Sequence, residues 1–197
     1  PASHIEFNEN SDPLLLTIGQ FRPSDQELGR LANLKIRENN QSATIAISKL
    51  RRPVHFASAD LNGDNKKDVV VCSFGNYGGK LSWFDNFEPS KEHVLSNLPG
   101  ARMVAIKDLN GDQKPDIVVL MAQAYEQISI YYNKGQGEFE EKKVLEFSPV
   151  HGVSYFELAD FNNDGFQDIL LTNGDNWDYS NVDKPYQGLR IYLNDGH

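Results

Sequence analysis

The segment DLNGDNKKD, from Asp60 to Asp68, recurs twice along the chain in closely related form. The copies are DLNGDQKPD, from Asp108 to Asp116, and DFNNDGFQD, from Asp160 to Asp168. Each copy places oxygen-bearing side chains at positions 1, 3, 5 and 9 of a nine-residue segment. The copies begin 48 and 52 residues apart, so each belongs to one unit of a structural repeat.

These segments predict three calcium loops. Ca²⁺ takes six to eight oxygen ligands, and a set without nitrogen or sulfur favours Ca²⁺ over Zn²⁺, while Mg²⁺ demands a stiffer octahedron. No arginine lies in the loops, so their nine aspartates would repel one another without a cation. The predicted ligands are Asp60, Asn62, Asp64, the Lys66 carbonyl and Asp68; Asp108, Asn110, Asp112, the Lys114 carbonyl and Asp116; and Asp160, Asn162, Asp164, the Phe166 carbonyl and Asp168.

The same residues could also form turns without metal or an EF-hand. Asp, Asn and Gly also favour solvated turns that hold no ion, and this alternative stays open. An EF-hand requires flanking helices, Gly at position 6 and Glu at position 12. Position 6 is glycine only at Gly165, and position 12 is Val71, Val119 or Leu171, so the sequence excludes an EF-hand.

The residues around each loop predict β-strands. An alternating segment precedes each loop and a β-branched run follows it, so the loop joins two antiparallel strands. A third strand and, in two units, a fourth strand follow. The predicted strands are 54–59, 69–71, 80–85 and 93–95; 103–107, 117–120, 127–132 and 139–147; and 153–159, 169–171 and 188–193.

Four antiparallel strands in about 50 residues are typical of one blade of a β-propeller. We therefore predict an all-β propeller segment of about four blades, at residues 5–50, 53–100, 101–150 and 151–197. The first blade is degenerate, because Leu16 stands where its last metal ligand would be, and we expect no metal there. The last blade lacks its outer strand. Either the stretch around His4–Asn8 fills that place or the chain belongs to a longer propeller, which we favour.

These repeats resemble the FG-GAP/VCBS repeats of integrin-α-like β-propellers. The resemblance lies in the loop followed by a hydrophobic run and in third strands that end near Asn-x-Gly, and Phe74–Gly75 supplies one literal Phe-Gly. It covers residues 53–197 well and 5–50 weakly. It implies a ring of seven or eight blades with calcium on one face. The family includes adhesion receptors, lectins, scaffolds of sugar lyases and secreted bacterial proteins.

Composition narrows the class of partner. The formal net charge of −9 predicts a surface that repels nucleic acid and anionic membranes. No apolar run approaches the roughly 18–20 residues of a membrane span, and the start PASHIEFNEN lacks the features of a signal peptide. The single cysteine, Cys72, stands in a β-branched run and is expected to be buried and inert.

A ligand is expected on the face opposite the calcium loops, where the remaining connections gather. Segment 173–188 is longer than its counterparts and carries three aromatic residues, which would either bind a ligand or pack over their own blade. The candidate ligand-binding residues are Arg51, Arg52, Tyr77, Tyr125, His151, Trp177 and Tyr179, with Arg102 and Tyr186 nearby.

The sequence favours a binding module over an enzyme, because it contains no G-x-S-x-G, H-E-x-x-H, P-loop or dinucleotide-binding motif. We expect an extracellular or periplasmic protein that presents its loop face to a protein or carbohydrate ligand. A dimer or further blades would complete the ring. The alternative is an accessory part of a larger secreted polysaccharide lyase or hydrolase, with a site built from Arg51, Tyr125 and His151.

Overall fold

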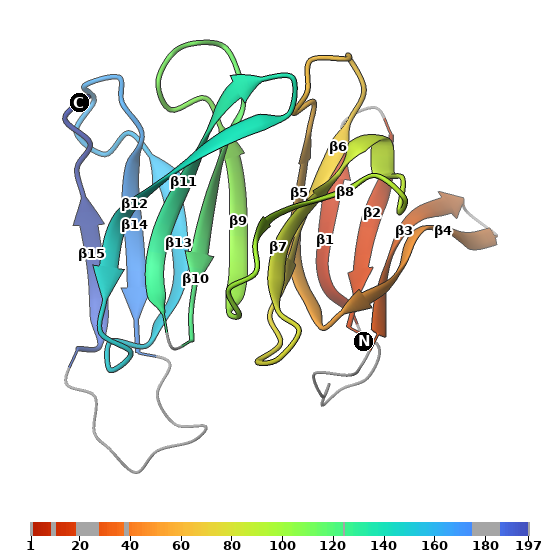
Figure 1. The fold of residues 1–197 in the computed structure, drawn as a ribbon, viewed down its shortest axis with the longest axis horizontal. Helices are drawn as coiled ribbons and strands as arrows, with labels where there is room; N and C mark the ends of the chain where they lie inside the picture. Colours follow the sequence, from red (N-terminus) through yellow and green to blue (C-terminus); the bar gives the residue numbers. More distant parts are fainter. Residues whose placement is uncertain are drawn as a thin grey trace.

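A computed structural model describes residues 2–8, 11–18, 28–37, 40–123, 125–174 and 186–196 of the 197-residue chain. Four antiparallel sheets stand side by side along an open arc (Figure 1). This arrangement confirms the predicted all-β propeller segment. Within the described residues, no helix is long and apolar enough to span a membrane.

The strands follow one another in chain order within every sheet. The first sheet holds β1 (Ala2–Asn8), β2 (Ser11–Thr17), β3 (Leu28–Arg37) and β4 (Asn40–Arg51). The second holds β5 (Pro53–Ala59), β6 (Asp68–Ser73), β7 (Lys80–Phe84) and β8 (Glu92–Ser96), with the short 3₁₀ helix η1 (Asp85–Phe87) after β7. The third holds β9 (Ala101–Lys107), β10 (Asp116–Met121), β11 (Glu126–Gly135) and β12 (Glu138–Phe147). The fourth holds β13 (Val153–Ala159), β14 (Asp168–Asn173) and β15 (Gly188–Tyr192).

Alternation along the strands places one face of a sheet against each neighbouring sheet. On β6, Val69 and Val71 pack in the cluster shared with the first sheet, whereas Val70 and Cys72 pack in the cluster shared with the third. The second strands β6 and β10 are buried along their whole length because both of their faces are covered. The Cys72 thiol is fully buried as expected, and burial raises its pKa.

The second residue of each of the first two acidic loops packs toward the sheet that follows. Leu61 is buried in the cluster between the second and third sheets. Leu109 is partly buried against the cluster between the third and fourth sheets. Phe161, at the same position in the last loop, is 40% exposed. The loops therefore contribute apolar side chains to the contacts between neighbouring sheets as well as polar side chains to the surface.

Hydrogen bonds also cross each boundary between sheets. The Ser58 hydroxyl donates to the Glu6 carboxylate at 2.5 Å, between the second and first sheets. The Asn133 amide donates to the Leu61 carbonyl at 2.9 Å, between the third and second. The buried Glu126 carboxylate accepts the Val153 N–H at 3.2 Å, between the third and fourth. Such bonds fix how far one sheet can slide along the next, because a buried polar group without a partner is costly.

The first strand argues against the less favoured of the two alternatives for the last sheet. β1 pairs with β2, up to Asn8 opposite Ser11, so residues 4–8 form the first strand of the first sheet and do not complete the last one. Only residues 9 and 10 connect the paired positions, and a short hairpin of this kind forms at a lower entropic cost than closure of a distant sheet. The short connection also leaves no room in the first sheet for a nine-residue acidic loop.

His55 lies at the boundary between the second and third sheets. Its Nδ1 accepts the backbone N–H of Val104 at 3.4 Å, and the ring of His4 lies 3.9 Å away, centroid to centroid. Burial lowers the pKa of His55 to about 4, with a smaller contribution from His4. A protonated imidazole could not accept the Val104 N–H, so the folded protein favours the neutral form.

This arrangement predicts that the pH dependence of stability changes when His55 is replaced. An unfolded His55 would take up a proton below its ordinary pKa of 6.5, whereas the folded protein resists protonation down to about pH 4. The stability that depends on neutral His55 is therefore present above pH 6.5 and is lost as pH falls toward 4, by up to about 3 kcal/mol. Urea unfolding of the native protein and of His55→Gln should give curves that converge or cross over this range. His93→Gln, at an exposed position on β8, is the control; parallel curves for native protein and His55→Gln would contradict the prediction.

Candidate metal centres and the opposite face

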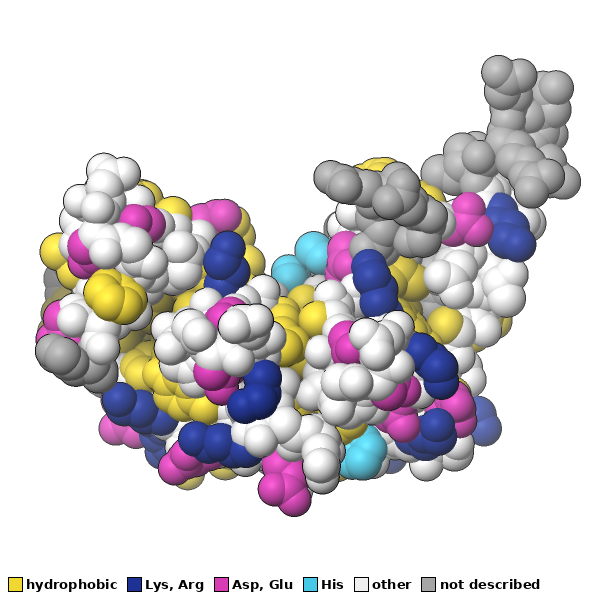
Figure 2. Space-filling model, turned by 90° about the horizontal axis from the view of Figure 1, so that it is seen from above, with side chains coloured by type: hydrophobic (Ala, Val, Ile, Leu, Met, Phe, Trp, Pro, Cys, Tyr) yellow, Lys and Arg dark blue, Asp and Glu magenta, His cyan; other side chains and the backbone are white. Residues whose placement is uncertain are grey.

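The three acidic loops lie at the same end of the arc, each between the first and second strand of its sheet (Figure 1). Figure 2 looks onto this end and shows acidic side chains on the projecting loops, with basic side chains between them and a hollow on the concave side of the arc. The common position follows from the repeat, because every loop joins equivalent strands.

The loops share one backbone shape. Positions 4 and 6 have positive φ in each copy: 85° at Gly63 and 64° at Asn65 in the first loop. In the second loop these positions are Gly111 and Gln113, and in the third they are Asn163 and Gly165. Left-handed conformations are easiest for Gly and accessible to Asn, so the residue types match the turn in two copies, and Gln113 is the exception.

The same shape directs backbone N–H groups at the loop side chains. In the first loop, Asp60 accepts the N–H of Asn65 at 2.8 Å, Asn62 accepts that of Asp64 at 3.0 Å, and Asp64 accepts that of Lys66 at 2.9 Å. The equivalent bonds recur in the second loop and in the third. The side chains predicted as metal ligands are therefore held in place by the loop's own backbone.

The last aspartate of each loop is a buried clamp. One oxygen of Asp116 accepts the N–H of Leu109 at 3.0 Å, at the start of the loop, and the other accepts the N–H of Asn133 at 2.9 Å, on the third strand. Asp68 and Asp168 make the corresponding pairs of bonds, and all three side chains are fully buried. Asn133 lies on the third strand, whereas Asn86 and Asn194 lie just after the third strands β7 and β15, so each clamp positions the loop against the end of its sheet.

The electrostatics of the loops favour a cation. Burial raises the pKa of Asp68 and of Asp116; their backbone N–H bonds oppose this rise, and neighbouring carboxylates add to it. At the exposed fifth position, the Asn86 amide lowers the pKa of Asp64, and the backbone N–H of Lys114 lowers that of Asp112. A cation placed among these groups would stabilise every carboxylate in its ionised form.

The donor set fits Ca²⁺ in chemistry. Every predicted ligand is an oxygen, and a carboxylate has about four acceptor positions, so the backbone N–H bonds leave acceptor capacity in each loop. Among the residues that the structure describes, which include all three loops, no group of three or more His, Cys, Asp or Glu side chains is gathered closely enough to hold a metal ion. Calcium binding therefore stays a prediction, and it requires the carboxylates to move inward.

The candidate ligand-binding residues do not form one site. Arg51 lies against Gly78, beside the highly exposed Tyr77. His151 lies between Phe147 and Tyr186, with its Nδ1 3.0 Å from the Ser148 carbonyl. Trp177 and Tyr179 lie outside the described residues.

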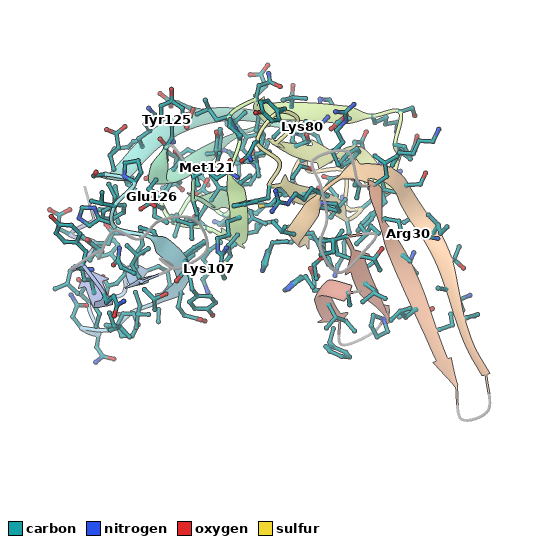
Figure 3. The ribbon with its side chains drawn as sticks, turned by 90° about the horizontal axis from the view of Figure 1, so that it is seen from below. Arg30, Lys80, Lys107, Met121, Tyr125 and Glu126 are labelled. Atoms are coloured by element: carbon teal, nitrogen blue, oxygen red, sulfur yellow. The ribbon has the colours of Figure 1, made fainter. Side chains whose placement is uncertain are left out.

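Tyr125 lies just before the third strand of the third sheet. It is 55% exposed and precedes β11, and Figure 3 shows it beyond Met121, whereas Lys107 lies toward the concave side. Arg51 ends β4, Tyr125 directly precedes β11 and His151 precedes β13, so these three residues come from three different sheets, and the enzymatic site built from them stays a prediction.

Among the candidates in the described part of the chain, Arg52 and Arg102 line one cavity. The cavity has a volume of about 610 Å³ and lies where the first strands of the four sheets begin, at the end opposite the acidic loops. Other residues that line it are His4, His55, Phe74 and Tyr155.

Residues that line this cavity stand at fixed distances before the acidic loops in the sequence. His55, Met103 and Tyr155 each stand five residues before the first aspartate of a loop, and Val54, Arg102 and Ser154 each stand six residues before it. Alignment of the repeats on their loops would have placed these residues together. The sequence alone indicated Arg52 and Arg102 as residues of this face, but it did not indicate the histidines or Tyr155 as part of it.

A sequence model described as an FG-GAP-like repeat matches residues 60–119 and again residues 108–171, which together make up more than half of the chain. The chain belongs to the FG-GAP-like repeat family. The expected resemblance is thereby confirmed, and the repeats form a β-propeller-like interaction module of a kind typical of extracellular or periplasmic proteins. No curated protein matches the chain.

The clamp of this FG-GAP-like repeat yields a prediction that needs no metal. Asp116→Ala would leave the N–H groups of Leu109 and Asn133 without their partner, at a cost of about 1–3 kcal/mol each. The free energy of unfolding, measured with denaturant in EDTA, should fall by about 2–4 kcal/mol. Asp12→Ala, at an exposed position on β2, should change it by less than about 0.5 kcal/mol. Equal effects of the two substitutions would show that Asp116 does not act as a clamp.

Proposed function

We propose that this protein is a calcium-stabilised propeller module that presents the face opposite its acidic loops to a protein or carbohydrate ligand outside the cytoplasm. The observation that carries the proposal is the threefold repetition of one loop, with the same hydrogen bonds to oxygen-bearing side chains in each copy. Three equivalent loops at one end of the arc are better explained by a shared structural role than by three reaction centres.

In this role calcium would stiffen the join between the strands of a sheet. The oxygen-bearing side chains of positions 1, 3 and 5 already accept backbone N–H groups of each turn, and in the second loop the closing aspartate connects the turn to the third strand. An ion bound there would link these groups, and binding energy that depends on the folded loop adds to the stability of the fold. The opposite face would then be held on a rigid scaffold, which suits recognition by loops.

The proposed calcium loops also favour a location outside the cytoplasm. Open calcium loops of extracellular modules bind with dissociation constants of about 10⁻⁴–10⁻³ M, so they are filled where calcium is abundant. The family supports the same placement, because its repeats are typical of extracellular or periplasmic proteins.

Calcium titration tests this function. With a dissociation constant of about 10⁻⁴ M, 1 mM free Ca²⁺ would add roughly 1.4 kcal/mol of stability per site. The melting temperature should rise with calcium and return to its starting value with EGTA, and calorimetry should find three ions per chain. Equal melting temperatures in millimolar calcium and in EGTA would contradict the proposal.

Substitutions in the loops test whether the calcium-dependent rise in melting temperature requires the loop aspartates. Asp60→Asn, Asp108→Asn and Asp160→Asn, combined in one chain, change the first ligand of every loop and should abolish the calcium response. Asp12→Asn makes the same chemical change at an exposed position on β2 and should preserve it. A response that survives the triple substitution would place the calcium sites elsewhere.

A further inference from the structure

Asn133 connects two acidic loops that belong to neighbouring sheets. It stands near the end of β11, and its side chain is almost fully buried. Its amide nitrogen, Nδ2, donates to the Leu61 carbonyl of the first loop at 2.9 Å and to the Pro115 carbonyl of the second loop at 3.1 Å. One buried amide group therefore joins a backbone carbonyl of each loop.

The residues that this amide joins also take part in the buried clamps. The N–H of Leu61 donates to the Asp68 carboxylate at 2.8 Å, in the clamp of the first loop. The N–H of Asn133 donates to the Asp116 carboxylate at 2.9 Å, in the clamp of the second loop. Because buried polar groups that lose a partner are costly, a shift of one loop backbone would disturb hydrogen bonds at the other loop.

The turn between β11 and β12 fits closely between the same two loops. A Cβ atom at Gly137 would lie 2.8 Å from the Trp83 ring and 3.7 Å from Cβ of Asn62, a predicted ligand of the first loop. A Cβ atom at Gly135 would lie 3.7 Å from Cε of Lys114, in the second loop. Contacts on both sides leave the turn little room to move independently of either loop.

The third loop lacks a connection of this kind. Asn194, which corresponds to Asn133, donates from its amide to the Gln167 carbonyl of its own loop at 3.4 Å. Among the residues that the structure describes, no hydrogen bond joins Asn194 to the second loop. A cavity of about 170 Å³ lies at this junction, and Asn194 and Leu109 of the second loop both line it. The second and third loops are therefore joined less tightly than the first and second.

We propose that Asn133 couples the first two acidic loops, so that calcium binding by one raises the affinity of the other, while the third loop binds independently. The predicted ligands Asp60 and Asn62 flank Leu61, so inward movement of these ligands would fix the backbone at the Leu61 carbonyl. Through Asn133, that carbonyl would hold Pro115 in place, and the second loop would lose less conformational freedom when it binds. The effect of the second loop on the first is equal, because a coupling free energy is reciprocal.

Repulsion between two bound cations would act in the opposite direction. Salt weakens this repulsion, with a Debye length of about 8 Å at 0.15 M, whereas buried hydrogen bonds are screened much less. Titrations at 0.15 M salt therefore measure the coupling that Asn133 carries. This inference rests on the proposed function, because it describes how the proposed calcium loops act together.

Calcium titrations that resolve the individual loops test the coupling. The amide NMR signals of Gly63 and Gly111 report the first and second loops separately. In a background of Asp160→Asn, which weakens the third loop, Asp60→Asn should raise the calcium concentration that half-saturates the second loop about two- to tenfold. Asp108→Asn should raise the half-saturation of the first loop by the same factor. Asp160→Asn alone should leave both values as they are in the native protein.

Substitution of Asn133 should remove the coupling. In Asn133→Ala, Asp60→Asn should no longer change the half-saturation of the second loop. Asn194→Ala makes the same change at the corresponding position of the fourth sheet and should leave the coupling intact. If the melting temperature shows that Asn133→Ala does not fold, Asn133→Ser keeps an oxygen acceptor for the Gly135 N–H without the amide donors and should give the same result.

The results distinguish this inference from the proposed function. Calcium binding by three loops that do not affect one another would overturn the inference and leave the calcium module standing. Coupling that survives substitution of Asn133, or that Asn194→Ala removes as well, would also overturn the inference alone. Absence of calcium binding at every loop would overturn both.

Discussion

A buried carboxylate at the end of each acidic loop holds together the start of that loop and a residue on or just after the third strand of its sheet. Asp116 does this through two backbone N–H groups, and Asp68 and Asp168 repeat the arrangement. A buried carboxylate is stable only with such partners. If the loop left the sheet, the aspartate would lose its backbone N–H partners or become exposed to solvent. The rest of the architecture depends on this constraint, since it places equivalent turns at one end of every sheet that carries them.

The two ends of the molecule carry different kinds of side chain because the acidic loops all lie at one end. The end with the loops concentrates carboxylates and turns its backbone N–H groups inward to its own side chains. The opposite end is built from connections and strand starts, where arginine, histidine and aromatic side chains meet around a cavity. In the proposed function, structural support and recognition would therefore lie at different ends of the molecule.

Local spacing explains what could be predicted from the sequence. The loops at Asp60, Asp108 and Asp160 were evident because their ligand pattern lies within nine residues, and the strands were evident from alternation on either side. Contacts between sheets are not local, so the sequence did not show that Arg52 joins His4 and Tyr155 while His151 packs elsewhere. The turn at Gln113 also adopts a left-handed conformation that its residue type does not favour, because the repeated loop imposes it.

The alternate packing of Val69 and Val70 on opposite neighbours has a consequence for how the arc folds. The core clusters of the described residues join each sheet to those beside it, as in a linear repeat protein, so the free energy approximates a sum of unit terms and nearest-neighbour coupling terms. Loss of a terminal unit removes one coupling term, whereas loss of an internal unit removes two. Cooperativity should therefore be greatest in the middle of the arc, and fraying should begin at its terminal units.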